Sequence, residues 1–520
     1  MISIDGHSLR WTDVIAAARG GMKVKLHPRA LPTIRAARKV IEDHLAAGDI
    51  IYGVSTGFGK FANIAIDHAH HAELQRNLVR SHAAGTGDPF NTETVRAMLL
   101  LRANALAKGA SGVRPVVIET LLRMLNAGVH PIIPQIGSLG ASGDLAPLAH
   151  LALVLIGEGE AEFGGRRMSG RAAMKKAGID PLELRAKEGL ALLNGTQAMG
   201  AMATLLREDA ALLCKSADLA GALSIDATLS SRHPCDEAIH RLRPYPGALL
   251  SAKNVRALLA GSQILASHAH CKRVQDPYSL RCLPQVHGAT RDAIAHLDEM
   301  LAIELNAATD NPLVLLKGAR RSSRRADRNV RPTSIVVSGG NFHGAPIAMR
   351  MDYAALALHE LGAISERRVD WIMNPNLTDL PAFLSPKEGL HSGYMIAQYT
   401  AAALVSENKS LCGPSSADSI PVSGNQEDHS SMGLTAARRA RMILQNVHTI
   451  LAIEILCAAQ AIYLRKLPTG RALQLAIAEL RKHVPPLKAD RVVARDIEKA
   501  RKLVESGALL RAAERGIDLG

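Results

Sequence analysis

Aromatic residues are scarce in this chain. They make up 3% of its 520 residues, although hydrophobic residues as a whole make up 47%. Alanine and leucine recur throughout instead, and these residues favour packed helices over sheets. We therefore expect a mainly α protein. At roughly 150 residues per domain, the length also indicates more than one domain.

Cysteine motifs for metals and disulfides are missing. The chain has six cysteines but no CxxC pair, and no histidine stands at zinc-finger spacing from them. The histidines at positions 68, 70 and 71 also match no strong metal-ligand motif. These absences argue against a disulfide framework, and we expect no metal site.

Leader and membrane-spanning patterns are missing as well. The N-terminus has no basic flank followed by an apolar run, which a signal peptide requires. The apolar run at 450–464 contains Glu454 and is shorter than the about 20 residues of a membrane span. We therefore expect a soluble, cytoplasmic protein without a membrane partner.

Acidic residues are too few to balance the basic ones, and the formal net charge is +14. A basic balance can indicate a nucleic-acid partner. Seven basic residues and one acidic residue gather at 317–331, but no aromatic residue stands among them to stack on bases. We interpret this segment as a solvated, mobile loop and expect no nucleic-acid partner. A helical protein that binds RNA through this loop is the rival hypothesis.

Long segments with helical periodicity dominate the second half of the chain. The segment 434–466 runs for over thirty residues without glycine or proline, and 345–373 has a similar pattern. Helices of this length gain most of their stability from neighbours that cover their apolar stripes. We expect a mixed α/β N-terminal domain at 1–200, a long-helix bundle at 201–465 and a helical C-terminal segment at 466–520.

A glycine-rich segment, "GSLGASGDLAPLAH" at 137–150, precedes an apolar run. Its three glycines recur at intervals of three residues and enclose Ala141, Ser142 and Gly143. The ordinary interpretation is a surface turn in which glycine supplies positive φ. A phosphate-binding loop is a weaker interpretation, because neither the Walker A motif nor the GxGxxG motif is present.

A third interpretation is that Ala141, Ser142 and Gly143 form a ring. The unhindered nitrogen of Gly143 can reach the carbonyl carbon of Ala141 if the backbone is tightly bent. Loss of water from the ring and from the Ser142 side chain would then leave a methylidene-imidazolone (MIO). This group is an electrophile that no ordinary side chain supplies, and it needs no external cofactor.

Several segments together resemble a known family, the aromatic amino acid ammonia-lyases and aminomutases, which carry MIO made from Ala-Ser-Gly. The segments include "YGVSTGFG" at 52–59, "KEGLALLNGTQ" at 187–197, "QDPYSLRCLPQVHG" at 275–288, "SGGNFHG" at 338–344 and "DSIPVSGNQEDHSSMG" at 418–433. The Ser81-His82 pair and the "NQEDH" segment look like the histidine-type members. The resemblance implies non-oxidative deamination of L-histidine to trans-urocanate and ammonia, the first step of histidine degradation. It also implies a homotetramer in which three subunits build each site.

The resemblance also implies roles for individual residues. Tyr52 matches the family's base, a role that requires surroundings favouring phenolate because an ordinary phenol has a pKa near 10. Tyr278 matches a hydroxyl close to the MIO ring, and Arg281 matches the anchor of the substrate carboxylate, which its planar fork can bind with two hydrogen bonds. Asn194 and Gln275 match amides that hold the polar ends of the substrate and the oxygen of the MIO ring. Phe342 matches the residue that packs on MIO.

Substrate choice depends on the residues that face the substrate side chain. An imidazole offers one donor and one acceptor, and a dry pocket must satisfy both. His82 and Glu407 match the histidine-type pattern and would supply such partners. Taken singly, His82 would be a structural histidine and Glu407 a solvated residue on a helix.

Some positions depart from the histidine-type pattern. Gly413 stands where histidine is usual, Ala417 where valine is common, and His391 where asparagine or glutamine is frequent. The change at His391 leaves other substrates open. The alternatives are an MIO-dependent lyase for ergothioneine, phenylalanine or tyrosine, or a 2,3-aminomutase.

Overall fold

The computed structural model describes residues 1–271, 273–316 and 334–520. The basic segment at 317–331 therefore lies outside the described residues. The chain divides into two compact units, each built from three separate stretches. The first unit holds Met1–Leu205, Asp298–Met351 and Pro414–Arg438, and the second holds Leu206–Leu297, Asp352–Gly413 and Arg439–Gly520.

The first unit is the mixed part of the protein. Its helices are α1 (Trp11–Ala18), α2 (Leu31–Ala46), α3 (His71–His82), α4 (Thr92–Ala107), α5 (Pro115–Ala127), α6 (Leu145–Leu155), α7 (Gly170–Lys176) and α8 (Glu188–Leu193). Its strands are β1 (Ile2–Ile4), β2 (Val24–Leu26), β3 (Thr86–Pro89), β4 (His130–Pro131), β5 (Pro134–Ile136), β6 (Glu160–Phe163), β7 (Arg166–Ser169), β8 (Leu313–Leu315) and β9 (Ile335–Val337). The strands form small sheets, in which β1 and β2 are parallel and the other pairs, β3–β5, β4–β6–β7 and β8–β9, are antiparallel.

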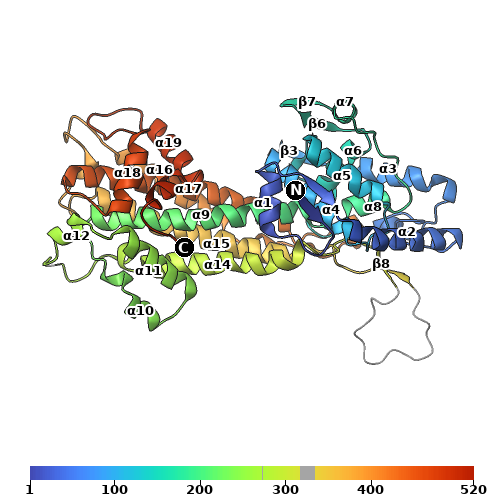
Figure 1. Ribbon diagram of the computed structural model, residues 1–520, viewed down its shortest axis with the longest axis horizontal. Coiled ribbons are helices and arrows are strands. Elements are labelled where there is room, and N and C mark those ends of the chain that lie inside the picture. Colours follow the sequence, from blue (N-terminus) through green and yellow to red (C-terminus); the bar gives the residue numbers. More distant parts are fainter. Residues whose placement is uncertain (272, 317–333) are drawn as a thin grey trace. The chain divides into compact units, whose positions relative to one another are not determined.

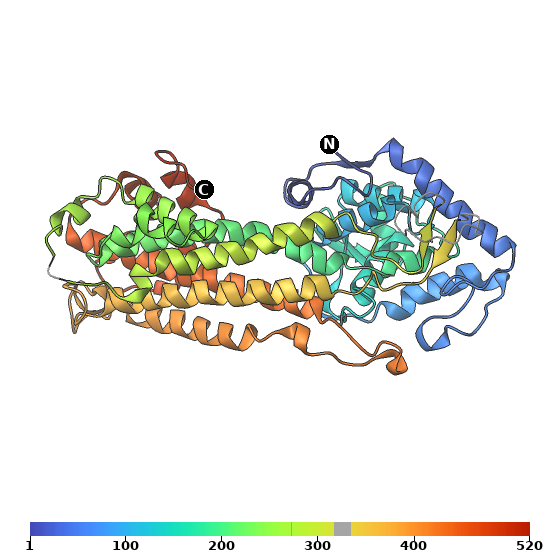
Figure 2. The same cartoon turned by 90° about the horizontal axis from the view of Figure 1, so that it is seen from below.

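The second unit is helical. Its own helices are α10 (Glu237–Arg241), α11 (Pro246–Leu258), α12 (Gln263–Ser267), α13 (Tyr278–Arg281), α16 (Met395–Leu411), α18 (Arg471–Arg481), α19 (Val493–Glu505) and α20 (Ala508–Ala513). Four long helices contribute residues to both units: α9 (Gln197–Ala227), α14 (Leu283–Glu304), α15 (Ala345–Met373) and α17 (Gly433–Arg465). Within the second unit, α9, α14 and α15 lie side by side (Figures 1 and 2). The prediction of a mainly α fold with long helices and a smaller mixed part is confirmed.

The two units interleave along the sequence, whereas the expected domains were three consecutive segments. The first unit includes 298–351 and 414–438, which lie inside the expected bundle at 201–465, and the second unit includes 466–520. The physical reason is the length of the helices that the two units share. The chain leaves the first unit on α9 and returns on α14, then leaves on α15 and returns in the loop that begins at Pro414, before α17. Helical periodicity reports which face of a helix is buried, but it does not report where the chain returns.

Helix α17 forms because its 33 residues contain no proline and no glycine after Gly433. It is long and apolar enough to cross a membrane, but 83% of its most apolar 18-residue stretch is buried inside the protein. That burial is typical of a core helix whose apolar stripes are covered on all sides.

A buried ion pair lies between two of the long helices within the second unit. Arg368 on α15 and Glu454 on α17 are fully buried, and the Arg368 Nη2–Glu454 Oε2 distance is 2.9 Å. Ser224 and Ser365 each donate a hydroxyl hydrogen bond to the same carboxylate. Every charged atom of the pair therefore has a partner, which a buried charge requires.

We predict that Glu454→Gln destabilises the protein by about 3 kcal/mol or more, because Arg368 would stay buried without its counter-charge. The measurement is the denaturant midpoint of unfolding. Glu360→Gln is the matched control, because it makes the same chemical change on α15, the helix of Arg368, at a side chain that is 62% exposed. A surface change of this kind should alter stability by less than about 0.5 kcal/mol. Equal midpoints for the two variants would contradict the prediction.

Candidate active site

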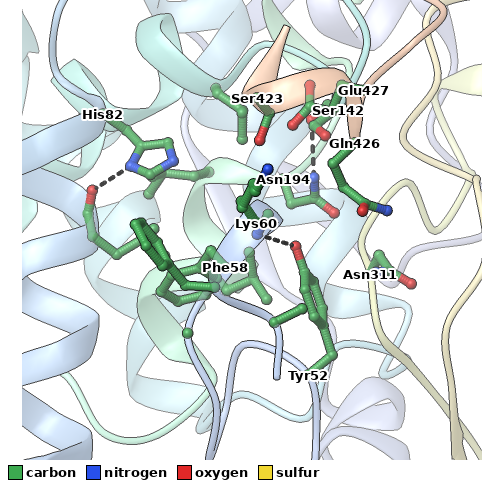
Figure 3. A pocket seen from close by; sticks show the side chains of 18 of the residues that line it. Tyr52, Phe58, Lys60, His82, Ser142, Asn194, Asn311, Ser423, Gln426 and Glu427 are labelled. Atoms are coloured by element: carbon green, nitrogen blue, oxygen red, sulfur yellow. Dashed lines mark hydrogen bonds between the residues drawn. The ribbon is translucent and has the colours of Figure 1, made fainter. Parts of the chain in front are cut away.

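A cavity of about 1080 Å³ lies in the first unit. Its walls come from the loop after α2, from α3, from the turn that contains the Ala-Ser-Gly segment, from the end of α8 and from loops before α15 and α17. Five of the predicted site residues line it: Tyr52, His82, Ala141, Ser142 and Asn194. Phe342 is a sixth, and Figure 3 shows the arrangement of several of these side chains.

The loop at 141–143 is tightly bent and lies against the chain at Gly195. Gly143 has a φ of +75°, and a β-carbon added to it would lie 2.2 Å from the Gly195 oxygen. The N–H of Asp144 donates to that same oxygen at 2.6 Å. Because the neighbouring atoms are backbone and cannot swing aside, only glycine fits at position 143.

Asn194 connects this loop to the cavity. Its Nδ2 donates to the carbonyl oxygen of Ser142 at 2.9 Å (Figure 3). Its Oδ1 is buried and has no hydrogen-bond partner among the described residues. A buried amide oxygen without a donor is costly, so a ligand with an N–H group would find an acceptor here.

Asp144 connects the 141–143 loop to the start of α9. Its fully buried carboxyl group accepts hydrogen bonds from the N–H groups of Ala198 and Met199, at the start of α9, and from the Ser138 hydroxyl. Burial raises the pKa of Asp144 to about 7, while these three donors oppose the rise. The carboxyl group thus binds the loop and the helix N-terminus together.

These observations fit the formation of MIO from the 141–143 loop. The bend is held at Gly143 by backbone contact, and the carbonyl of Ser142 has a fixed donor in Asn194. Ala141 is 7% exposed and Ser142 lines the cavity, so a reactive group formed there would face the space that a ligand can enter.

Tyr52 lies on the loop that follows α2. Its hydroxyl oxygen accepts a hydrogen bond from the Gly59 N–H at 3.1 Å (Figure 3). The rings of Tyr52 and Phe58 pack edge to face, and their centroids are 6.4 Å apart. The phenol is therefore held in one orientation, with its oxygen serving as an acceptor at the cavity wall.

His82 ends α3, and its ring has one nitrogen bound and one available. Nδ1 donates to the Leu78 carbonyl oxygen at 2.9 Å, and the other nitrogen faces the cavity (Figure 3). Burial lowers the pKa of His82, while the Leu78 carbonyl and the charge of Glu427 oppose that effect. A neutral His82 with its proton on Nδ1 presents Nε2 as an acceptor.

Besides Gly143, four predicted residues do not line this cavity. Gln275, Tyr278 and Arg281 line a different cavity, within the second unit. The Arg281 guanidinium carbon lies 4.5 Å from the centre of the Tyr278 ring. Glu407 lies on α16 and accepts a hydrogen bond from Asn446 at 2.7 Å. Their roles in binding and catalysis stay predictions.

His391 lines neither cavity. Its Nδ1 accepts a hydrogen bond from the Asp490 N–H at 3.3 Å. Within one chain, His391 is therefore not placed to contact a substrate in either cavity.

Other lining residues were given no role by the sequence analysis. Many of them are apolar, and those with polar or charged side chains include Lys60, Gln426, Glu427 and His429. The sequence does contain a pattern that points to Glu427. It is the third residue of the "NQEDH" segment at 425–429, which looks like the histidine-type members. The carboxylate that influences His82 in this chain is thus Glu427.

The comparisons with known proteins agree with this geometry. The chain matches the model of a family described as aromatic amino acid lyase over residues 9–482. It is 53% identical to a histidine ammonia-lyase from Gloeobacter violaceus, over 98% of this chain and 97% of that protein. Its fold resembles a histidine ammonia-lyase from Trypanosoma cruzi, with a TM-score of 0.89, 41% identity and coverage of 99% and 96%. A tyrosine aminomutase from Streptomyces globisporus has a TM-score of 0.91 at 39% identity, with 100% of both chains covered.

We predict that Asp144 makes stability depend on pH. Its pKa is 3.8 in an unfolded chain and about 7 in the fold, so the folded state binds the proton more tightly. The free energy of unfolding should therefore fall as the pH rises from 4 to 7, by about 1.4 kcal/mol per pH unit from this group.

The measurement compares unfolding of the protein and of Asp144→Asn at pH 5, 6 and 7. Asparagine keeps an acceptor for the two backbone donors but has no proton to lose. The protein should lose on the order of 2 kcal/mol relative to the variant between pH 5 and 7. Parallel stability curves would show that the Asp144 carboxyl group does not titrate in this range.

Proposed function

The chain belongs to the aromatic amino acid lyase family, and from that premise we propose that it is a histidine ammonia-lyase. It would convert L-histidine to trans-urocanate and ammonia, the opening reaction of histidine degradation, in the cytoplasm. The observation that carries the proposal is the bent 141–143 loop at a cavity lined by Tyr52, His82 and Asn194. The 53% identity to a histidine ammonia-lyase over almost the whole chain supports it.

The prosthetic group would be MIO, formed from Ala141, Ser142 and Gly143 without an external cofactor. When formed, it supplies an electrophilic methylene that activates either the amine or the imidazole of the substrate. Asn194 holds the carbonyl oxygen of Ser142 through Nδ2. Its unpaired Oδ1 is then free to accept an N–H from the substrate ammonium group.

Tyr52 is the proposed base. The Gly59 N–H donates to its oxygen, and this donor stabilises negative charge that develops there when the phenol loses its proton. The phenolate would then accept a proton from the β-carbon of the substrate, and the electron pair of that C–H bond stays with the substrate. Phe58 limits the movement of the ring, so the oxygen stays in place during proton transfer.

The imidazole of the substrate would lie between His82 and Glu427. Nε2 of His82 and the carboxylate of Glu427 are both acceptors, and both residues line the cavity. The single N–H of a neutral imidazole can donate to one of these acceptors, and a protonated imidazole can donate to both, whereas a phenyl ring would leave both buried without a donor. This difference favours histidine over phenylalanine.

The remaining predicted residues would act in a homotetramer. Gln275, Tyr278 and Arg281 line a cavity of their own in the second unit. We propose that these residues, with Arg281 as the carboxylate anchor, complete the site of another subunit. Phe342 would pack on MIO within the same chain, whose cavity it lines.

The main alternative is another reaction of the same family. The tyrosine aminomutase from Streptomyces globisporus matches this fold as well as a histidine ammonia-lyase does. The two acceptors that face the substrate side chain favour histidine. A product assay separates the two reactions directly.

We predict that the purified protein forms urocanate from L-histidine, and that Ser142→Ala abolishes this activity while leaving the fold intact. The reason is that alanine lacks the hydroxyl group that must leave to form the methylidene. The measurements are urocanate absorbance and the mass of the peptide that contains 141–143, which should be lower by two water molecules than its sequence requires.

Formation of cinnamate, coumarate or a β-amino acid from phenylalanine or tyrosine, without urocanate from histidine, would contradict the assignment. A linear 141–143 peptide in active protein would contradict the role of MIO. Helical circular dichroism of Ser142→Ala serves as the control for folding.

We predict that Glu427→Gln lowers kcat/KM for histidine by about 10- to 100-fold, because hydrogen bonds to charged groups contribute about 1.5–3 kcal/mol. Glu407→Gln is the matched comparison. It makes the same chemical change at Glu407, the carboxylate that the histidine-type sequence pattern assigns to the substrate imidazole. The larger loss identifies the carboxylate that binds imidazole. A larger loss for Glu407→Gln would mean that the partner of His82 comes from α16 of a neighbouring subunit.

A further inference from the structure

Arg102 is a fully buried arginine next to the candidate site. It lies on α4, and its side chain is among the largest in the protein with no exposure to solvent. Nη1 donates to the Asn194 carbonyl oxygen at 3.1 Å and to Gln197 Oε1 at 2.6 Å, and Nη2 donates to the Ala191 carbonyl oxygen. The guanidinium thus binds the chain on both sides of Gly195.

The guanidinium also touches the place where a side chain of Gly195 would be. A β-carbon added to Gly195 would lie 2.2 Å from Arg102 Nη1 and 2.4 Å from Gln197 Oε1. A second close contact involves the Gly195 oxygen, which a β-carbon at Gly143 would approach to 2.2 Å. The backbone at Gly195 is therefore confined between the guanidinium and the 141–143 loop.

Stability alone does not explain a charge in this position. The acceptors of Arg102 among the described residues are two carbonyl oxygens and an amide oxygen. The carboxylate that influences it, Asp310, forms its own ion pair with Lys187 at 2.7 Å. Burial lowers the pKa of Arg102 to about 10, so the group stays charged at neutral pH. A buried charge without a direct counter-ion costs stability, whereas a rigid fork of donors fixes backbone position well.

We propose that Arg102 is a positioning residue for ring closure in the 141–143 loop, holding Asn194 and Gly195 against Gly143. This inference rests on the proposed function, because it assumes that the loop forms MIO. Arg102 would act before the enzyme first turns over. It would take no part in binding the substrate, since it does not line the cavity.

Ring closure needs no reagent beyond the loop itself. The Gly143 nitrogen forms a bond to the Ala141 carbonyl carbon, and the Ala141 oxygen leaves as water with the amide protons of Gly143 and Ser142. The Ser142 hydroxyl leaves as a second water with the α-hydrogen of Ser142. The step is slow unless the Gly143 nitrogen is held close to the carbonyl carbon, and that is the geometry that Arg102 would maintain through Gly195.

The test uses Arg102→Lys in the full-length protein, because lysine keeps the charge and loses the planar fork. Peptide mass gives the fraction of 141–143 that has lost two waters, followed over time after synthesis. Circular dichroism and the thermal midpoint report folding. We expect a folded variant whose ring forms at least about 10-fold more slowly than in the unchanged protein, the loss expected when one positioning hydrogen bond of about 1.4 kcal/mol is removed.

Arg368→Lys is the matched control, because Arg368 is equally buried but lies in the second unit. It should lower the thermal midpoint and leave ring formation complete. Ring formation in Arg102→Lys at the rate of the unchanged protein would overturn the inference. Equal slowing in both variants would overturn it too, since slow closure would then follow from lost stability.

If Arg102→Lys does not fold, Gln197→Leu replaces it, because leucine removes an acceptor that holds the guanidinium and keeps Arg102 itself. Slower ring formation in this variant supports the inference, and an unchanged rate overturns it. A linear loop in the unchanged, active protein would refute the proposed function. A loop that cyclises in every variant at the rate of the unchanged protein would refute the role of Arg102 and leave the proposed function standing.

Discussion

The close contact between the backbone at Gly143 and the backbone at Gly195 is the constraint on which the site depends. A side chain cannot be accommodated at Gly143, and the same Gly195 oxygen accepts a hydrogen bond from Asp144. Backbone atoms cannot rotate away as the end of a flexible side chain can, so this contact sets the bend of the 141–143 loop. The amide of Asn194 is placed by the same contact, because it precedes Gly195 in the chain.

Several buried charged groups surround that contact, and each costs stability. Asp144 is buried with a pKa near 7, Arg102 is buried without a carboxylate in direct contact, and Lys187 pairs with Asp310 out of reach of solvent. Apolar side chains of similar size would fill the same space at lower cost. Charged groups, however, form directed hydrogen bonds that hold backbone atoms at fixed positions. Asp144 and Arg102 bind the backbone next to the Gly143–Gly195 contact in this way, as a site under geometric constraint requires.

The sequence was sufficient to predict the helical class, the long helices and the bent loop, because these depend on local composition and spacing. The interleaving of the two units was not predictable, since periodicity does not report which unit a helix returns to. The two candidate carboxylates illustrate the same limit. Glu407 lies on the helix α16 and Glu427 in a loop at the cavity, yet each stands within a motif of the histidine-type pattern. Only the tertiary structure distinguishes which one shares a cavity with His82 in this chain.

An amino acid substrate has two polar ends, and the cavity of one chain is equipped mainly for the side chain. Among the described lining residues, Lys60 is the only lysine or arginine. The planar fork that suits a carboxylate belongs to Arg281, which lines another cavity and has a buried Nε without a hydrogen-bond partner. An unpaired donor of this kind costs free energy until an acceptor reaches it. A carboxylate would supply that acceptor, and binding one is the role proposed above for Arg281.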